Sequence, residues 1–257
     1  MNSLQERSEQ LAQTRFLGGP KRDFERVGRM GLEMLLAEGL TPSARVLDVG
    51  CGALRLGYWL MRFLNPRCYF GIEPQQDMLA VGLEQIVEPE VVQRAEAKFS
   101  SNDDFDFSAF GERFDFVVAR SIWTHASRAQ IEKMLESFAA TSSPTGVFMA
   151  SYYPAGAWFE VGHRWPRLEP IVIKLPLAEL SPLLARLPAL AGNREYRGEG
   201  WVGRSHECNE PGVVKHSLPW IAEEARRHGL EVQLAPYPIV NHQYWLRIRR
   251  ADAQQQP

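Results

Sequence analysis

Apolar runs of strand length alternate with helical periodicities along residues 44–153. The segment 54–64 is apolar on nearly all sides, and Leu79, Leu83 and Ile86 recur at helical spacing, so both stretches predict helices. Four short apolar runs have the composition of buried strands: 44–50, 68–73, 114–119 and 146–153. This alternation predicts parallel strands joined by right-handed crossovers, which is an open α/β sheet.

One of the crossover helices has a well-marked start. Ser127 and Gln130 have the spacing of a capping box, in which each side chain binds the backbone N–H of the other residue. The helix that follows would present one apolar face, made of Ile131, Met134, Leu135 and Phe138. The sequence therefore predicts a helix capped by Ser127.

The regular pattern stops at Pro154 and returns after Lys215. The residues between them are rich in proline, glycine and aromatic side chains and show no clean period. A helix follows, with Pro219 suited to its first turn and Gly229 to its C-terminal cap. Five residues separate the last two strand-like runs, and so short a connection predicts an antiparallel pair. These two runs are 230–237 and 243–250.

Composition narrows the class of protein. The chain has 257 residues, 45% of them hydrophobic, and a net charge of −2, which fits a globular enzyme without a general attraction for nucleic acid. Three widely spaced cysteines favour a reducing compartment over a disulfide framework. The most apolar stretch, 171–191, contains three charged residues and three prolines, so no membrane span is expected. We expect a cytoplasmic protein.

The clearest chemical motif is VLDVGCGALRLG, residues 46–57. Gly50 and Gly52 fall in a strand-to-helix turn, where glycine lets the backbone approach a ligand closely. Arg55 stands where the dinucleotide fingerprint needs its third glycine. Asp48 adds a negative charge, which disfavours a pyrophosphate and favours a cationic ligand.

The pattern D-x-G-C-G-x-x-x-x-G, followed by a strand that ends in the acidic residue Glu73, resembles motifs I and II of class I S-adenosylmethionine-dependent methyltransferases. The resemblance implies a seven-stranded Rossmann-like sheet with helices on both faces, and a last strand that is antiparallel and inserted beside the sixth. It also implies a single methyltransferase domain over 1–257. Its parts would be an N-terminal helical cap at 1–45, a core at 46–153 and 216–250, and a substrate-covering insertion at 154–215.

The same resemblance implies which residues bind S-adenosylmethionine. The glycine loop would wrap the amino-acid and ribose parts, and Glu73, 23 residues after Gly50, would bind the ribose hydroxyls. Asn102, Asp103 or Asp104 could bind the adenine amino group, although such residues are also ordinary loop formers. The predicted cofactor residues are Asp48, Gly50, Cys51, Gly52, Glu73, Pro74, Asn102, Asp103, Arg120 and Ser121. Phe16, Phe24 and Arg26 are candidates for closing the pocket from the N-terminal segment.

Two histidines are the catalytic candidates. His125, in ARSIWTHAS after the fourth strand of the resembled sheet, could take the proton of an acceptor hydroxyl, or could be a loop histidine that binds backbone. His242, next to Asn241 in the last connection, could reach the edge of the pocket. The DPPY or NPPY motif of many base N-methyltransferases is absent at this position.

The role of the insertion and that of two other histidines can each be interpreted in more than one way. Aromatic residues in the insertion could form a lid, a small satellite core or a homodimer contact; they are Trp158, Phe159, Trp165, Tyr196 and Trp201, with His163 among them. His206, Cys208 and His216 match no zinc spacing, so no metal is expected.

The function that these residues favour is methyl transfer from S-adenosylmethionine to a small molecule or a sugar or glycan. O-methylation with a histidine base fits best, and extensive contact with nucleic acid is not expected. The alternative is an RNA or protein methyltransferase, or a catalytically silent subunit that only binds the cofactor.

Overall fold

A computed structural model describes residues 3–15, 17–18, 23–155, 195–198, 201–204 and 213–251. The chain divides into two compact units. Unit 1 contains Met1–Val118 and Thr141–Ser143, and unit 2 contains Ala119–Ala140 and Pro144–Pro257. Among the described residues, no helix is long and apolar enough to cross a membrane.

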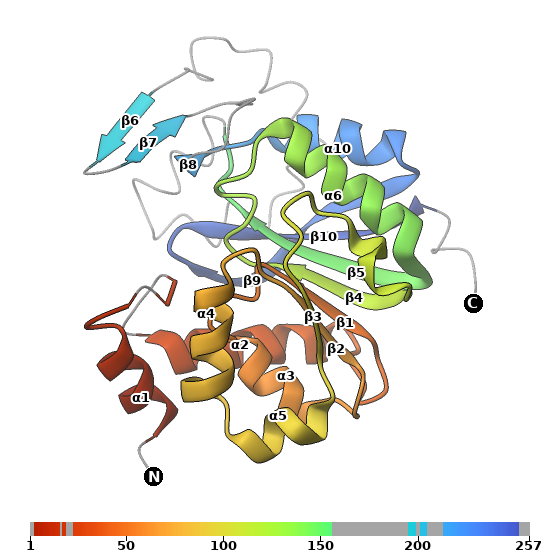
Figure 1. Ribbon diagram of the computed structural model, residues 1–257. Helices are drawn as coiled ribbons and strands as arrows, with labels where there is room; N and C mark the ends of the chain where they lie inside the picture. The colour runs from red at the N-terminus through yellow and green to blue at the C-terminus, as the bar shows by residue number, and fades with distance from the viewer. Residues whose placement is uncertain are drawn as a thin grey trace. The chain divides into compact units, whose positions relative to one another are not determined.

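Seven strands form one mixed sheet in the order β3-β2-β1-β4-β5-β10-β9 (Figure 1). The strands are β1 Val46–Val49, β2 Tyr69–Ile72, β3 Lys98–Ser100, β4 Phe114–Ala119, β5 Ser142–Tyr152, β9 Leu230–Val240 and β10 Gln243–Arg250. β1 pairs in parallel with β2 and β4, and β2 pairs in parallel with β3. β10 is antiparallel to both β5 and β9. This topology confirms the predicted sheet, including the antiparallel last strand inserted beside the sixth.

Unit 1 is built around two strands, β1 and β2, that have no exposed position. All four residues of β1 and all four of β2 are buried, because helices cover this part of the sheet and leave no solvent face. Phe70 packs edge-on against Phe110 and Phe114, with ring centroids 5.3 Å apart in each pair. The helical elements of unit 1 are α1 Leu4–Leu11, α2 Phe24–Ala37, α3 Gly57–Phe63, α4 Gln76–Val81, η2 Gly82–Ile86, α5 Pro89–Ala95 and η3 Phe107–Phe110.

Two of these helices differ from the sequence-based expectation. The predicted helix over 54–64 begins only at Gly57, because Leu54 has φ +60° and the chain before it forms a turn. The amphipathic stretch around Leu79 divides into α4 and the π-helix η2. A Cβ at Gly82 would lie 2.8 Å from atoms of Ala53 and Leu54, so a glycine at the junction lets this helix approach the turn closely.

Unit 2 confirms the predicted helix starts. The Ser127 N–H donates to Gln130 Oε1 at 2.9 Å, and the Gln130 N–H donates to Ser127 Oγ at 3.3 Å, which is a complete capping box for α6, Arg128–Thr141. α10, Leu218–Arg227, is capped by the Ser217 hydroxyl. Gly229 follows it with φ +68°, as its predicted role requires. The predicted apolar face of α6 is buried in full: Ile131, Met134, Leu135 and Phe138.

The connection between the last two strands is shorter than predicted. β9 continues to Val240, so that only Asn241 and His242 join it to β10. Both turn residues have positive φ, +53° and +59°, the backbone of a type I′ hairpin turn. The expected end at Tyr237 was wrong because β9 is an edge strand, where Pro238 removes no ladder hydrogen bond that the sheet needs. The antiparallel pairing itself is confirmed.

The insertion contains a second sheet that the sequence pattern did not predict. Its strands are β6 Glu195–Gly198, β7 Trp201–Arg204 and β8 Val213–Val214, in the order β6-β7-β8. β6 and β7 are antiparallel, and β7 and β8 are parallel. The strands are short, and β6 and β7 contain glycine, so they lack the period-2 signal of a longer strand.

Candidate functional site

The predicted glycine loop is a tight turn that is hydrogen-bonded to the end of β2. Gly50 and Gly52 have φ +69° and +54°, values that glycine adopts without steric cost. The N–H groups of Gly50 and Cys51 both donate to the Ile72 carbonyl, at 2.8 and 3.1 Å. The loop therefore has a fixed position at the carboxyl ends of β1 and β2, the edge where open α/β sheets bind ligands.

Glu73 lies beside the glycine loop, as its spacing predicts. Its side chain is buried, with 6% exposure. Oε2 accepts a hydrogen bond from the Gly52 N–H at 2.8 Å, and Oε1 accepts one from the Gln75 N–H at 2.8 Å. A carboxylate offers about four lone-pair sites. Two sites thus hold the protein backbone in place, and about two remain for donors from a ligand.

Asp48 is the second carboxylate of this part of unit 1. It is buried in β1 and accepts a hydrogen bond at 3.0 Å from the Tyr69 hydroxyl. Sequence reasoning missed Tyr69, although a tyrosine in a wholly apolar strand signals a buried hydroxyl that needs a partner. A Cβ at Gly57 would lie 2.5 Å from that hydroxyl, so the third glycine of the motif makes room for this pair.

Burial keeps the neutral groups around these carboxylates uncharged. Burial, with the charges of Asp48 and Glu73, raises the pKa of the Cys51 thiol well above its ordinary value. Burial and the Asp48 charge raise the pKa of Tyr69 in the same way. The two carboxylates therefore give the loop region a negative local charge, which favours a cationic ligand.

Arg55 explains why the loop departs from the dinucleotide fingerprint. Its guanidinium is buried and donates to the carbonyls of Leu17 and Gly18, at 3.3 and 2.8 Å. The same group lies 4.8 Å from the ring centroid of Phe24, at the start of α2. A glycine at position 55 could make none of these contacts, so the arginine joins the N-terminal segment to the glycine loop.

Other predicted residues of unit 1 have different environments. Arg26 is half exposed and pairs with Asp23 at 3.1 Å, which is a solvated position rather than a pocket wall. Phe16 lies outside the described residues. Phe24 is buried. Pro74 is exposed after Glu73.

The loop after β3 distinguishes the three adenine candidates. The Asn102 amide donates to the Asp106 carbonyl at 3.0 Å and to Ser100 Oγ at 3.3 Å, so this side chain closes the loop. Asn102 Oδ1 is buried and has no hydrogen-bond partner within the described part of the chain. Asp103 and Asp104 are exposed. The adenine contact stays a prediction for each of them.

Unit 2 contains a polar network at the predicted methionine end of the cofactor. Ser121 has φ +60°, and its N–H donates to Ser151 Oγ at 2.7 Å. The Ser121 and Ser151 hydroxyls both donate to Gln243 Oε1, at 2.9 and 2.7 Å. Ser151 and Gln243 are buried, and sequence reasoning missed both. The only local signal was a polar residue in an otherwise apolar strand.

The turn that contains His125 is fixed by its backbone. The His125 N–H donates to the Ile122 carbonyl at 2.9 Å, and Thr124 Oγ1 donates to the Ser121 carbonyl at 2.9 Å. Trp123 and Thr124 are fully buried, whereas His125 is exposed. The turn therefore presents the imidazole at the surface of unit 2 from a well-anchored backbone.

The end of the insertion and the residue after it support this turn. The Val214 N–H donates to the Thr124 carbonyl at 2.9 Å, and His216 Nε2 lies 3.0 Å from the Ala126 carbonyl. His216 is fully buried and packs against Trp220. His216 thus braces the turn, while His206 and Cys208 lie outside the described residues.

The remaining predicted residues of unit 2 are placed as follows. His242 is exposed in the β9–β10 turn, directly before Gln243. Arg120 is half-buried after β4. Trp158, Phe159, His163 and Trp165 lie outside the described residues, so the lid stays a prediction.

Comparison with known proteins agrees with this geometry. Residues 46–146 match a family model described as a methyltransferase domain. Magnesium protoporphyrin IX methyltransferase from Synechocystis PCC 6803, with bound SAH, is 14% identical, with 95% of this chain and 93% of that chain covered and a TM-score of 0.54. The glycopeptide N-methyltransferase MtfA, complexed with S-adenosyl-L-methionine, is 16% identical over 87% and 94% of the two chains, with a TM-score of 0.54. The DhpI–SAH complex is 14% identical over 97% and 94%, with a TM-score of 0.55.

The matched segment contains the glycine loop, Glu73 and the His125 turn. Together with the sheet order, the match shows a Rossmann-like methyltransferase domain that contains residues 46–146. The family match and the fold support the predicted enzyme class. The similar structures named above were solved with S-adenosylmethionine or S-adenosylhomocysteine bound, which agrees with the predicted cofactor.

Proposed function

We propose that this methyltransferase transfers its methyl group to a hydroxyl of a small molecule or a glycan, with His125 as the general base. The observation that carries the proposal is the His125 turn. Its neighbours Trp123, Thr124, Ala126 and Ser127 are buried, and the imidazole is the exposed group among them. A general base has to be held at a defined position within reach of the acceptor, and an exposed side chain on an anchored backbone suits that requirement.

The residues of unit 1 suit the cofactor. About two lone-pair sites of the Glu73 carboxylate are left over by the backbone, and a ribose has two hydroxyls to donate. Asp48 and Glu73 supply negative charge near the loop, which stabilises a ligand that carries a sulfonium and an ammonium group. We place the ribose on Glu73 for these reasons.

A hydroxyl acceptor is a weak nucleophile until its proton leaves, so O-methylation needs a base. The acceptor oxygen forms a bond to the methyl carbon as the carbon–sulfur bond breaks, and S-adenosylhomocysteine leaves with both bonding electrons. The hydroxyl proton passes to the His125 imidazole. Most of the acceleration comes from holding the two reactants in line, and proton removal by the imidazole adds about 10²–10⁴-fold.

The similar structures support a small or medium-sized acceptor. Their names give a magnesium porphyrin and a glycopeptide as substrates. A net charge of −2 disfavours extensive contact with a phosphate backbone, which an RNA methyltransferase needs. In this proposal residues 154–215 cover the acceptor within a single domain, His242 lies at the pocket edge, and the protein works in the cytoplasm. A homodimer contact through the insertion is the alternative use of that segment.

The test measures binding and turnover separately. Calorimetry gives the Kd for S-adenosylmethionine, and release of S-adenosylhomocysteine reports turnover on panels of phenols, oligosaccharides, RNA and proteins. We expect turnover on a hydroxyl compound or a glycan, and His125→Ala should lower kcat by about 10²–10⁴-fold with an unchanged cofactor Kd. Glu136→Gln, an exposed change on α6, is the matched control.

Each failure has a distinct meaning. Full turnover by His125→Ala on the true acceptor would show that His125 is not the general base and would leave the proposed cofactor site standing. Turnover confined to RNA or protein replaces the acceptor class. Cofactor binding without turnover on any panel identifies a silent subunit, and a lack of cofactor binding overturns the whole proposal.

A further inference from the structure

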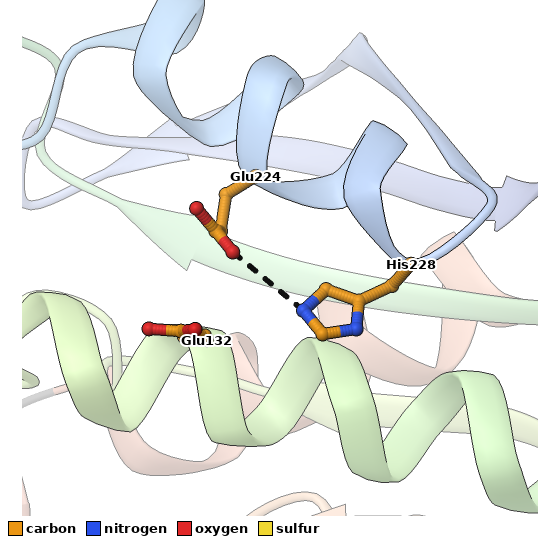
Figure 2. A group of neighbouring side chains, drawn as sticks. All are labelled: Glu132, Glu224 and His228. Atoms are coloured by element: carbon orange, nitrogen blue, oxygen red, sulfur yellow. Dashed lines mark ion pairs between the residues drawn. The ribbon is translucent and has the colours of Figure 1, made fainter.

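Three side chains of metal-ligating types meet between two helices of unit 2. Glu132 comes from α6, Glu224 comes from α10, and His228 directly follows α10. One ligand atom from each lies within 4.8 Å of the other two (Figure 2). Figure 2 shows Glu132 on the helix that faces Glu224 and His228, so the three groups converge from two elements.

The cluster has an oriented pair at its centre, formed by buried Glu224 and partly buried His228. The Glu224 side chain is only 6% exposed, and its Oε2 accepts a hydrogen bond from Arg227 Nη1 at 3.0 Å. This contact leaves Oε1 facing His228 Nε2 at 3.6 Å. That distance is too long for a hydrogen bond, and Nε2 is buried without a hydrogen-bond partner within the described ranges. A buried ring nitrogen without a hydrogen-bond partner needs an explanation, and a bound ligand would provide one.

A divalent transition metal satisfies these atoms. Zinc binds imidazole nitrogen and carboxylate oxygen at about 2.0–2.2 Å in a tetrahedral arrangement, which places neighbouring ligand atoms about 3.3–3.5 Å apart. The pair formed by Glu224 and His228 is already close to that separation, at 3.6 Å. Glu132 is exposed, so its side chain can move by the remaining distance at little cost.

We infer that Glu132, Glu224 and His228 bind a zinc-class divalent cation, with water in the fourth position. Two carboxylates and one neutral imidazole balance the charge of such an ion, and the mixed N/O set suits zinc better than magnesium. Arg227 acts on the site by orienting the Glu224 carboxylate. The ion joins α6 to the C-terminal end of α10, and its role is independent of the proposed methyl transfer.

The competing interpretation is a simple ion pair. A protonated His228 pairs with Glu224 one helical turn earlier, and a positive charge at a helix C-terminus is favourable. In that case Glu132 contributes nothing, because it is exposed and forms no part of the pair. The two interpretations therefore differ in the effect of Glu132.

The experiment titrates the full-length protein with zinc after treatment with a chelator and desalting. Calorimetry at pH 7.5 is run on the wild type, Glu132→Gln and His228→Asn. Glu136→Gln lies on the same helix, is exposed, and serves as the matched control. Circular dichroism shows that each variant is folded, and a calorimetric Kd for S-adenosylmethionine monitors the cofactor site separately.

We expect a zinc-binding event whose affinity falls at least 10-fold in Glu132→Gln and in His228→Asn and is unchanged in Glu136→Gln. Zinc at about 100 times its Kd should raise the Tm of the wild type by roughly 5–10 °C and have no such effect on His228→Asn. An absence of zinc binding, or zinc affinity unaffected by the first two substitutions, overturns the inference. Magnesium binding with the same dependence on the variants overturns the choice of metal.

Discussion

The substitution Glu73→Gln tests whether one buried carboxylate both fixes the glycine loop and binds the cofactor. In the ligand-free protein, this carboxylate accepts N–H groups from Gly52 and Gln75, each at 2.8 Å. Glutamine keeps the shape but replaces one acceptor oxygen with an amide donor. One backbone N–H then faces a donor inside a site with 6% exposure, so a bond to a charged group is lost. Such a bond contributes about 1.5–3 kcal/mol, and we expect the free energy of unfolding to fall by that amount.

Glu73→Gln should also raise the Kd for S-adenosylmethionine. If the two remaining lone-pair sites bind the ribose hydroxyls, glutamine weakens two charge-assisted hydrogen bonds. At about 1.5 kcal/mol each, the loss is about 3 kcal/mol, which raises the Kd for S-adenosylmethionine by about 150-fold. Isothermal titration calorimetry measures the Kd, and urea unfolding measures the stability.

Glu84→Gln is the control, since Glu84 is an exposed glutamate of the same unit. A Kd within threefold of the wild-type value for Glu73→Gln would refute the ribose contact. An unchanged free energy of unfolding would refute the role of Glu73 in holding the loop. The Kd therefore tests the ribose contact, and the free energy of unfolding tests the anchoring of the loop by Glu73.

Three further predictions follow from buried polar groups. Gln243→Leu removes the acceptor shared by the Ser121 and Ser151 hydroxyls, so it should lower the free energy of unfolding by about 1–3 kcal/mol and reduce kcat. Gln243→Glu keeps an acceptor oxygen and should restore most of both. A leucine variant as stable in urea as the wild type would contradict the network. Tyr152 is fully buried, its hydroxyl lacks a hydrogen-bond partner among the residues described, and burial raises its pKa. As the pH rises, the unfolded state therefore loses this proton before the folded state does. The free energy of unfolding is unaffected by this group below about pH 10 and falls above it by about 1.4 kcal/mol per pH unit. Tyr152→Phe should keep its stability at pH 7 and show a shallower alkaline loss by that amount in urea titrations between pH 9 and 11, and an identical slope would show that Tyr152 ionises in the folded state. Arg55→Met removes the hydrogen bonds to the carbonyls of Leu17 and Gly18, so tryptic cleavage at Arg15 should become at least several-fold faster. An unchanged cleavage rate would mean that other contacts hold the N-terminal segment.

The elements that follow local patterns were predicted well. β4 and β10 have the predicted bounds residue for residue; β4 is a short, mainly apolar run, and β10 begins directly after the turn at Asn241 and His242. Ser127 and Gly229 were found because caps depend on residues within one helical turn. β9 was predicted too short, since the sequence does not show that it is an edge strand, where proline is tolerated.

Residues of the candidate site were likewise predictable only where they follow a local pattern. The glycine loop and Glu73 were predictable because a βαβ unit places the ends of its parallel strands side by side. Gln243 was not predictable, because it meets Ser121 across 122 positions of the chain. The cluster of Glu132, Glu224 and His228 has the same origin, since its spacing matches no local metal motif.

The sequence by itself determined the class of this protein. Alternating strands and helices, the glycine loop and an acidic residue at the end of the next strand are short-range patterns, and they specify a Rossmann-like methyltransferase core and its cofactor. Only the tertiary structure decided which polar side chains share hydrogen bonds, that Tyr69 partners Asp48, that Arg55 holds the N-terminal segment, and that two helices bring a histidine and two glutamates together. The physical reason is range: periodicity and capping act over a few residues, whereas burial and hydrogen bonding depend on neighbours that only the folded chain brings into contact.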